Sequence, residues 1–240
     1  MMNDQITFEQ WILRIGGVVL IIGALMGMVG NLIHPATPSG DPEGVARTIA
    51  ESESWVIVHL VIVFGLIFML GGLVAIYHSI SGGLAGALVR LGFIAAIAGV
   101  TVGLILVTLD GIAAKHIAEA WATAPPEEEA TALRLVLAEQ NLDFALAALF
   151  NILFAGFTFI LYGLAVALSR VYPRWLGWVV VVAGIGSIVV GIIQAYEGKS
   201  TPTTRVLTII FPTIITLWLA LMGVLVVRKA SSQEGAIAPD

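Results

Sequence analysis

Cysteine is absent from this sequence, and charged residues are scarce. Without cysteine the chain cannot form disulfides, thiolate metal sites or thiol redox centres. Charged residues make up 11% of the 240 positions, whereas soluble domains carry about 25%. The 11 Lys and Arg are scattered and the net charge is −5, so no basic face of the kind that binds nucleic acid is present. These shortages exclude a soluble globular domain and a nucleic-acid partner.

Long hydrophobic runs take the place of the missing charge. Hydrophobic residues make up 59% of the chain, and the mean hydropathy is +1.01. An apolar helix needs about 20 residues to cross a bilayer, and six stretches reach this length: residues 11–33, 55–78, 85–109, 142–168, 174–195 and 204–227. We therefore predict an all-α polytopic membrane protein in which residues 1–240 form a single domain of six transmembrane helices.

Positive residues at the span ends predict the orientation. Arg170, Arg174, Arg228 and Lys229 lie directly beside span ends, where cytoplasmic loops carry an excess of Lys and Arg. The first span follows acidic residues and precedes no small-residue cleavage site, so we expect it to be retained rather than removed as a signal peptide. The prediction is a multi-pass protein of the plasma (inner) membrane with both termini in the cytoplasm.

The three spans that run outward begin alike. Each has a basic residue, then a glycine, then a second glycine seven residues on: Arg14-Ile15-Gly16 with Gly23, Arg90-Leu91-Gly92 with Gly99, and Arg174-Trp175-Leu176-Gly177 with Gly184. One interpretation is three pseudo-repeated hairpins of common origin packed through glycine stripes. The other is chance, because the chain contains 26 Gly.

The connections on the predicted outer side contain further helices. Asp41 followed by proline is a typical helix start, and the pattern predicts a short amphipathic helix to about Ser52. Residues 110–140 are expected to project from the bilayer as a helical hairpin broken at Pro125–Pro126, which offers a surface to a partner. We expect the small, polar segment 231–240 to be a disordered tail.

Polar and small residues form a stripe along the fourth span. At about 100° per residue, the polar members share one direction with small residues between them: Gln140, Asp143, Asn151, Thr158 and Tyr162. These residues are candidates for the wall of a ligand-filled cavity. The alternative is that they hydrogen-bond neighbouring helices and hold the bundle together.

Three histidines share a predicted depth at the outer membrane boundary with an aspartate. We consider His34, His59, Asp110 and His116 as candidate ligands for zinc, iron or haem, or as a proton relay. The alternative is that these histidines are solvated or cap helices, since no HxxxH pair is present. Asp110 and His116 are about 120° apart on an ideal helix, so an unbroken helix could not aim both at one ion.

Several chemistries lack their sequence signatures. No lysine lies at mid-membrane depth for a retinal Schiff base, and no glycine-rich phosphate loop or GxSxG elbow occurs. These gaps favour a non-enzymatic protein without a cofactor, whose outward-opening cavity binds a lipid-like or small amphipathic ligand or a membrane partner. One alternative is a metal- or haem-dependent membrane enzyme or redox protein. Another is a structural subunit of a larger complex or a homo-oligomer.

The opening of the fifth span carries a family resemblance. Pro173-Arg174-Trp175-Leu176-Gly177, a short outer helix from Asp41 and a second span ending in Tyr77-His78 resemble a bacterial six-span membrane family catalogued as domain of unknown function 4386. The resemblance implies a six-helix integral membrane protein and brings no reaction, ligand or site residue. The long connection between the third and fourth spans departs from the shorter one that the family leads us to expect.

Overall fold

The computed structural model describes residues 2–38, 41–198 and 201–235, and this part of the chain forms helices and no strand. In chain order, the helices are α1 (Met2–Ile33), α2 (Pro42–Glu51), α3 (Trp55–Ser79), α4 (Gly83–Thr108), the π-helix η1 (Leu109–Ala113), α5 (Ala114–Ala122), α6 (Glu129–Phe150), the π-helix η2 (Asn151–Thr158), α7 (Phe159–Ser169), α8 (Arg174–Glu197) and α9 (Pro202–Gly235). The all-α prediction is therefore confirmed.

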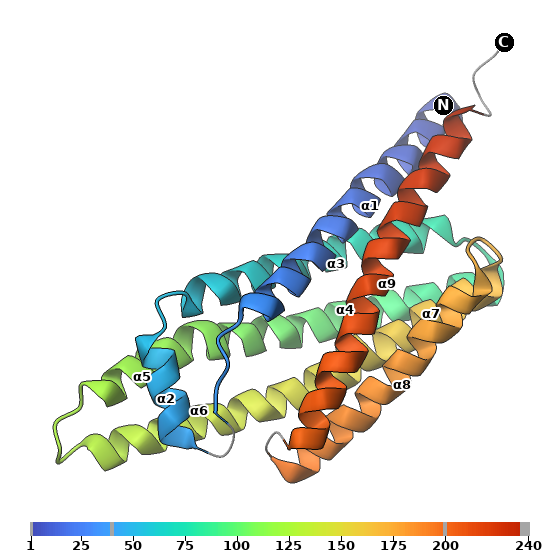
Figure 1. Ribbon diagram of the computed structural model, residues 1–240. Helices are drawn as coiled ribbons and strands as arrows, with labels where there is room; N and C mark the ends of the chain where they lie inside the picture. The colour runs from blue at the N-terminus through green and yellow to red at the C-terminus, as the bar shows by residue number, and fades with distance from the viewer. Residues whose placement is uncertain (1, 39–40, 199–200, 236–240) are drawn as a thin grey trace.

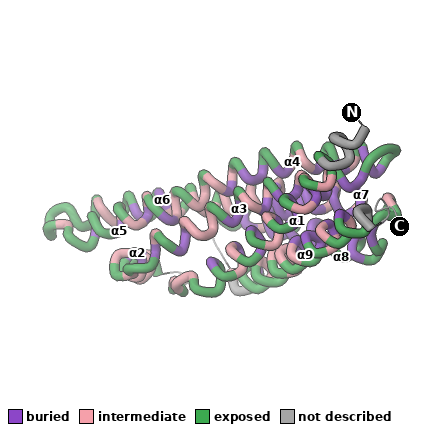
Figure 2. The backbone as a smooth tube through the Cα atoms, turned by 90° about the horizontal axis from the view of Figure 1, so that it is seen from above, coloured by how far each residue is buried: buried purple, intermediate pink, exposed green. Residues whose placement is uncertain are grey.

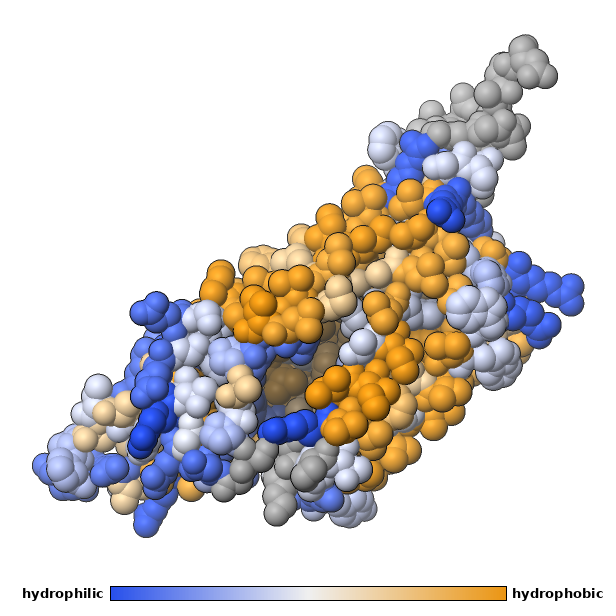
Figure 3. Space-filling model, viewed as in Figure 1, coloured by the Kyte–Doolittle hydropathy of each residue, from blue (hydrophilic) through white to orange (hydrophobic). Residues whose placement is uncertain are grey.

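Six continuous helical rods are long and apolar enough to cross a membrane. They cover Phe8–Ile33, Trp55–Ser79, Gly83–Ala122, Glu129–Ser169, Arg174–Glu197 and Thr203–Ser232. Large hydrophobic side chains remain on their outer surfaces, for example Leu32, Ile94 and Val182, and the space-filling view shows a broad hydrophobic surface over them (Figure 3). Such a surface is suited to lipid tails. The prediction of a multi-pass membrane protein with six helices is confirmed.

The six rods form a closed ring in the order of the sequence. α1 packs on α3, α3 on α4, α4 on the rod of η2 and α7, that rod on α8, and α8 on α9. α9 then closes the ring by packing along α1 (Figure 1). Apart from this closing contact, each span packs mainly on its neighbours in the sequence.

Glycines let the backbones of neighbouring rods approach closely. A Cβ placed on Gly72 would lie 2.5 Å from the Leu20 Cα, and one on Gly99 would lie 2.7 Å from the Phe154 Cα. Gly23 likewise meets the Met69 nitrogen of the following span, whereas Gly184 meets Gly156 of the preceding one. The third hairpin thus packs differently from the first two. A common origin for the hairpins stays a prediction.

The two ends of the ring differ in construction. At one end, which we call the termini end, lie the start of α1, the end of α9 and the short connections at 80–82 and 170–173. At the other end, which we call the projection end, α5 and the first half of α6 extend beyond the bundle with α2 beside them (Figure 1). Buried residues concentrate in the bundle, whereas the projection is mainly exposed or intermediate (Figure 2).

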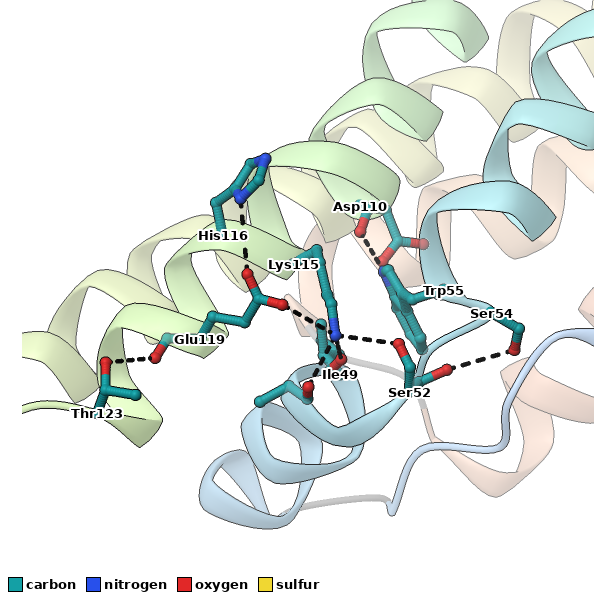
Figure 4. Close-up of polar contacts among 10 residues, drawn as sticks. Ile49, Ser52, Ser54, Trp55, Asp110, Lys115, His116, Glu119 and Thr123 are labelled. Atoms are coloured by element: carbon teal, nitrogen blue, oxygen red, sulfur yellow. Dashed lines mark hydrogen bonds and ion pairs between the residues drawn. The ribbon is translucent and has the colours of Figure 1, made fainter.

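Local contacts fix α2 against the projection. Asp41 caps its first turn by accepting a hydrogen bond from the Gly44 nitrogen at 2.9 Å, as the sequence indicates for this position. At the other end of α2, the Lys115 Nζ donates to the carbonyls of Ile49, Ala50 and Ser52 at 3.1, 2.7 and 3.0 Å (Figure 4). A cation there complements the negative end of the helix dipole. These contacts hold α2 beside α5.

The C-terminal helix is longer than expected. α9 continues to Gly235, so the first five residues of the segment 231–240, for which we predicted disorder, are helical. The rest of that segment, 236–240, lies outside the described residues. The Lys229 Nζ donates to the Ser79 carbonyl at 2.8 Å, and this contact ties the end of α9 to the end of α3.

Candidate ligand cavity and histidine centre

A cavity of about 390 Å³ lies inside the ring, toward the projection end. We call it the inner chamber. Its wall is largely aliphatic and aromatic, with contributions from five of the six spans. The wall residues include Gly27, Ile62, Leu66, Met69, Leu106, Ala147, Phe150, Phe154, Ile215 and Leu219. A chamber of this size and lining suits an apolar group.

A second cavity of about 580 Å³ adjoins the inner chamber and lies between α2, α6 and the start of α9. We call it the vestibule. The two cavities share His34, Asp110, Asp143 and Phe144 in their walls. The rest of the vestibule is more polar and includes Glu139 and Arg205. An apolar space therefore passes into a charged one at the level of the shared residues.

The cavity also opens sideways between α1 and α9. A hollow of about 350 Å³ is lined by Asn31, His34 and Arg205 together with residues 35–37, and the space-filling view shows it between the diverging ends of these two helices, with hydrophobic residues at its floor (Figure 3). α1 and α9 touch closely at Gly17 and Gly223 in the other half of the bundle. Because the two helices separate from that point, the opening reaches the depth of the spanning segments.

Three polar atoms in the vestibule region lack a hydrogen-bond partner among the described residues. They are Glu139 Oε1, Gln140 Nε2 and Asp143 Oδ1, which lie within about one turn of each other on α6. Glu139 is only 6% exposed. Leaving a buried polar atom unsatisfied costs about 1–3 kcal/mol. The wall therefore presents two acceptors and one donor that a bound molecule could satisfy.

His34, His59 and Asp110 meet where the two cavities join. The His34 Nε2 lies 3.2 Å from the His59 Nε2, and the Asp110 Oδ2 lies 3.1 Å from the His59 Nε2 and 4.0 Å from the His34 Nε2. We call this group the histidine centre. His59 is 2% exposed, whereas His34 and Asp110 reach the vestibule.

Each ring in the histidine centre is held from its other side. The His59 Nδ1 lies 2.6 Å from the Trp55 carbonyl oxygen, and the His34 Nδ1 lies 2.9 Å from the Pro35 carbonyl oxygen. The ring of Trp55 packs on both histidines, with centroids 4.9 Å apart in each pair. Burial, opposed in part by Asp110, lowers the pKa of His34 below its ordinary value.

The π-helix η1 positions the carboxylate of this centre. Asp110 is its second residue, and a π-turn interrupts the regular i to i−4 hydrogen-bond pattern. The Trp55 Nε1 donates to the Asp110 carbonyl oxygen at 2.7 Å (Figure 4). Gly111 follows, and a Cβ at that position would collide with the His59 ring. A wide turn and a glycine thus bring α3 against Asp110.

The predicted site residues separate into two groups. Gln140 and Asp143 lie at the vestibule. Asn151, Thr158 and Tyr162 donate instead to the Gln194 side chain and to the carbonyls of Leu153 and Leu73, at 2.8, 3.1 and 3.1 Å. The bonds of Asn151 and Tyr162 match the alternative in which such residues hold helices together, whereas the Thr158 bond lies within η2. None of the three residues is among the described residues lining the inner chamber or the vestibule.

His116 lies apart from the other three candidate metal ligands. Its side chain is 74% exposed and faces Glu119, with its Nδ1 3.7 Å from a carboxylate oxygen, on a different part of the helix from Asp110 (Figure 4). Sequence reasoning missed Trp55, Glu139 and Arg205 as residues of the site. Glu139 could have been found from the sequence, because it is an acidic residue directly before Gln140, the first residue of the polar stripe.

One comparison with known proteins, the scan against family models, gives a match, and it covers nearly the whole chain. The family model described as Domain of unknown function (DUF4386) matches residues 15–228. The chain belongs to this family. The DUF4386 match begins in α1 and ends in α9, so it includes all the residues of the histidine centre and both cavity walls. Searches of curated proteins and of solved structures give no match.

Proposed function

We propose that this DUF4386 protein binds a lipid-like or small amphipathic ligand, with the apolar part in the inner chamber and the polar head in the vestibule. The observation that carries this proposal is the direct passage from an apolar cavity of about 390 Å³ to a polar one of about 580 Å³. Binding sites for small molecules commonly have such volumes, with mostly apolar walls and a few polar groups.

The unsatisfied atoms of α6 suggest the chemistry of the head group. Glu139 and Asp143 offer acceptor oxygens that have no partner in the part of the chain that the structure describes, so a head with hydroxyl or amine donors would satisfy them. Gln140 contributes one donor. The gain from such pairing is large because buried polar atoms otherwise lose their hydration without compensation.

The side opening supports entry from the membrane. It lies between α1 and α9 beside Asn31 and Arg205, and both helices belong to spanning rods. An aliphatic chain could therefore move from the bilayer into the inner chamber without crossing water. Together with the predicted orientation, the side opening supports a ligand that enters from the outer leaflet of the plasma membrane. Binding of this kind requires no chemical reaction.

Filling the inner chamber tests the proposal. Ala147 lines the chamber on α6, so Ala147→Phe should place a ring in the space for the apolar chain. We expect this variant to weaken binding of a dansyl-labelled single-chain amine by about tenfold or more, since overpacking costs about 1–3 kcal/mol. Energy transfer from tryptophan to dansyl, measured on the purified full chain in detergent, reports the binding.

Ala145→Phe is the matched control, because Ala145 is on the same helix but is exposed. It should bind the probe like the unmodified protein, and both variants should elute from size exclusion as a single folded species. Equal binding by Ala147→Phe and the unmodified protein would reject the inner chamber as the ligand site. Asp143→Asn should weaken the amine probe but not a matching probe with a neutral hydroxyl head.

A further inference from the structure

With neutral imidazoles and an ionised Asp110, the histidine centre contains three acceptor atoms that face one another: the Nε2 atoms of His34 and His59 and the Asp110 Oδ2. A carbonyl oxygen accepts but does not donate, so the Nδ1 atoms of His34 and His59 must carry the protons in their contacts with the carbonyls of Pro35 and Trp55. In a neutral imidazole the other nitrogen is then a lone pair. Both Nε2 atoms therefore present lone pairs.

These lone pairs point at each other and at a carboxylate. The two Nε2 atoms are 3.2 Å apart, and the Asp110 Oδ2 is 3.1 Å from one of them. Two neutral imidazoles with both Nδ1 atoms protonated cannot form a hydrogen bond across this gap. The arrangement requires a cation among the three atoms, which is either a shared proton or a metal ion.

We propose that this cation is a zinc ion bound by His34 Nε2, His59 Nε2 and Asp110 Oδ2. All three atoms lie within 4.8 Å of one another. Zinc binds imidazole and carboxylate at about 2.0–2.2 Å, so neighbouring ligand atoms in a tetrahedron are roughly 3.3–3.6 Å apart. The separations of 3.1, 3.2 and 4.0 Å bracket that value.

The surroundings of the three atoms are those of a prepared metal site. Metal-binding histidines usually donate their second nitrogen to a carbonyl or carboxylate, which fixes the ring and its tautomer. Trp55 provides this carbonyl for His59, and its indole nitrogen also donates to the backbone of Asp110. One residue therefore orients two of the three ligands, one from its own helix and one from the neighbouring span.

The fourth position of the zinc ion would face the cavities. His34 and Asp110 line both the inner chamber and the vestibule, and His59 lines the inner chamber. A water molecule or an oxygen of a bound molecule therefore has room to complete the coordination. A zinc site with three protein ligands and one open position is an accessible site rather than a closed structural one. The inference does not depend on the amphipathic ligand, because zinc alone is the probe.

Metal analysis of the full chain tests the site. The protein, purified in detergent and treated with a chelator, should bind one equivalent of added zinc, and cobalt in its place should give the visible absorption of a tetrahedral centre. Loss of a partner that merely orients a ligand costs about 10–100-fold in metal affinity. We therefore expect Asp110→Asn and His34→Gln each to weaken zinc binding by more than about 100-fold.

His116→Asn is the matched control, because this third histidine of the projection end lies outside the centre. It should bind zinc like the unmodified protein. Asp110→Asn keeps the size of the side chain and the backbone bond to Trp55, and His34 follows the end of α1, so circular dichroism should show folded variants. A folded protein that binds no zinc, or variants that bind it unchanged, would overturn the proposal and leave a shared proton as the cation.

Discussion

The two halves of the bundle differ in how closely their helices pack. Glycine contacts join the helices toward the termini end, whereas a cavity separates them toward the projection end. Toward the termini end, glycines bring backbones together, as at Gly72 with Leu20 and Gly17 with Gly223. Toward the projection end, α1 and α9 separate, and the inner chamber occupies the space between them. Close packing in one half thus supports a cavity in the other.

Polar side chains in the two halves also differ in whether the fold satisfies their hydrogen bonds. Tyr162 in the packed half is fully buried, and its hydroxyl donates to the Leu73 carbonyl. Glu139 and Asp143 at the cavity each keep an oxygen without a partner among the described residues. A polar atom that is satisfied within the fold contributes to packing, whereas an unsatisfied one beside a cavity is available to a ligand. Substitutions should therefore affect stability in one half and binding in the other.

The largest effect on stability is expected from Gly72→Ala. Its new methyl group would lie 2.5 Å from the Leu20 Cα, and backbone cannot move aside as a flexible side chain does. We expect the free energy of unfolding to fall by about 1–3 kcal/mol, measured by thermal or chemical unfolding in detergent. Gly71→Ala is the control, since its methyl would meet only Val19 at an ordinary 3.7 Å. Equal stability of the two variants would contradict the close-packing account.

A smaller effect is expected from a hydrogen bond between η2 and α8. The Asn151 Nδ2 donates to the Gln194 Oε1 at 2.8 Å within the bundle. Removing it by Asn151→Leu should cost about 0.6 kcal/mol, the average for such bonds between membrane helices, and no more than about 1.7 kcal/mol. A double-mutant cycle with Gln194→Leu isolates the coupling. If Asn151→Leu also abolishes probe binding while stability is unchanged, Asn151 acts on the ligand rather than on the fold.

The smallest effect on stability is expected from Gly27→Ala. A methyl group at Gly27 would approach the Met69 Cε at 2.5 Å, but this is the end of a flexible side chain beside the inner chamber. Met69 can move into that space, so unfolding should change by less than about 1 kcal/mol. Binding of the dansyl amine should weaken instead. A loss of stability as large as that of Gly72→Ala would remove the distinction between the two halves.

Hydropathy was enough to predict the six spans, because each needs about 20 apolar residues whatever its neighbours are. Helical periodicity was less successful at assigning the site. The stripe on the fourth span assumed an ideal helix from Gln140 to Tyr162, but η2 covers residues 151–158. A π-helix changes the angle between successive residues. Gln140 and Asp143, which precede η2, are at the vestibule, whereas Thr158 and Tyr162 bond to backbone carbonyls.

The histidine centre also shows that the sequence could not assign the site completely. Four candidate ligands share a depth that the sequence indicates, but depth does not specify the direction of a side chain. η1 aims Asp110 toward His59, and His116, six residues later, faces Glu119. Trp55 joins the site from the helix of His59, four residues earlier. Arg205 joins it from α9, which is distant in sequence, and no local pattern marks it.

What the sequence alone determined is the class of protein and its solvent: apolar composition and run length require helices that satisfy their backbone hydrogen bonds within each segment. What only the tertiary structure decided is which polar side chains are satisfied by the fold and which remain open to a cavity. That outcome depends on where α1 and α9 diverge and on the two π-helices. Both are products of packing between rods, and packing is a property of pairs of segments rather than of any one of them.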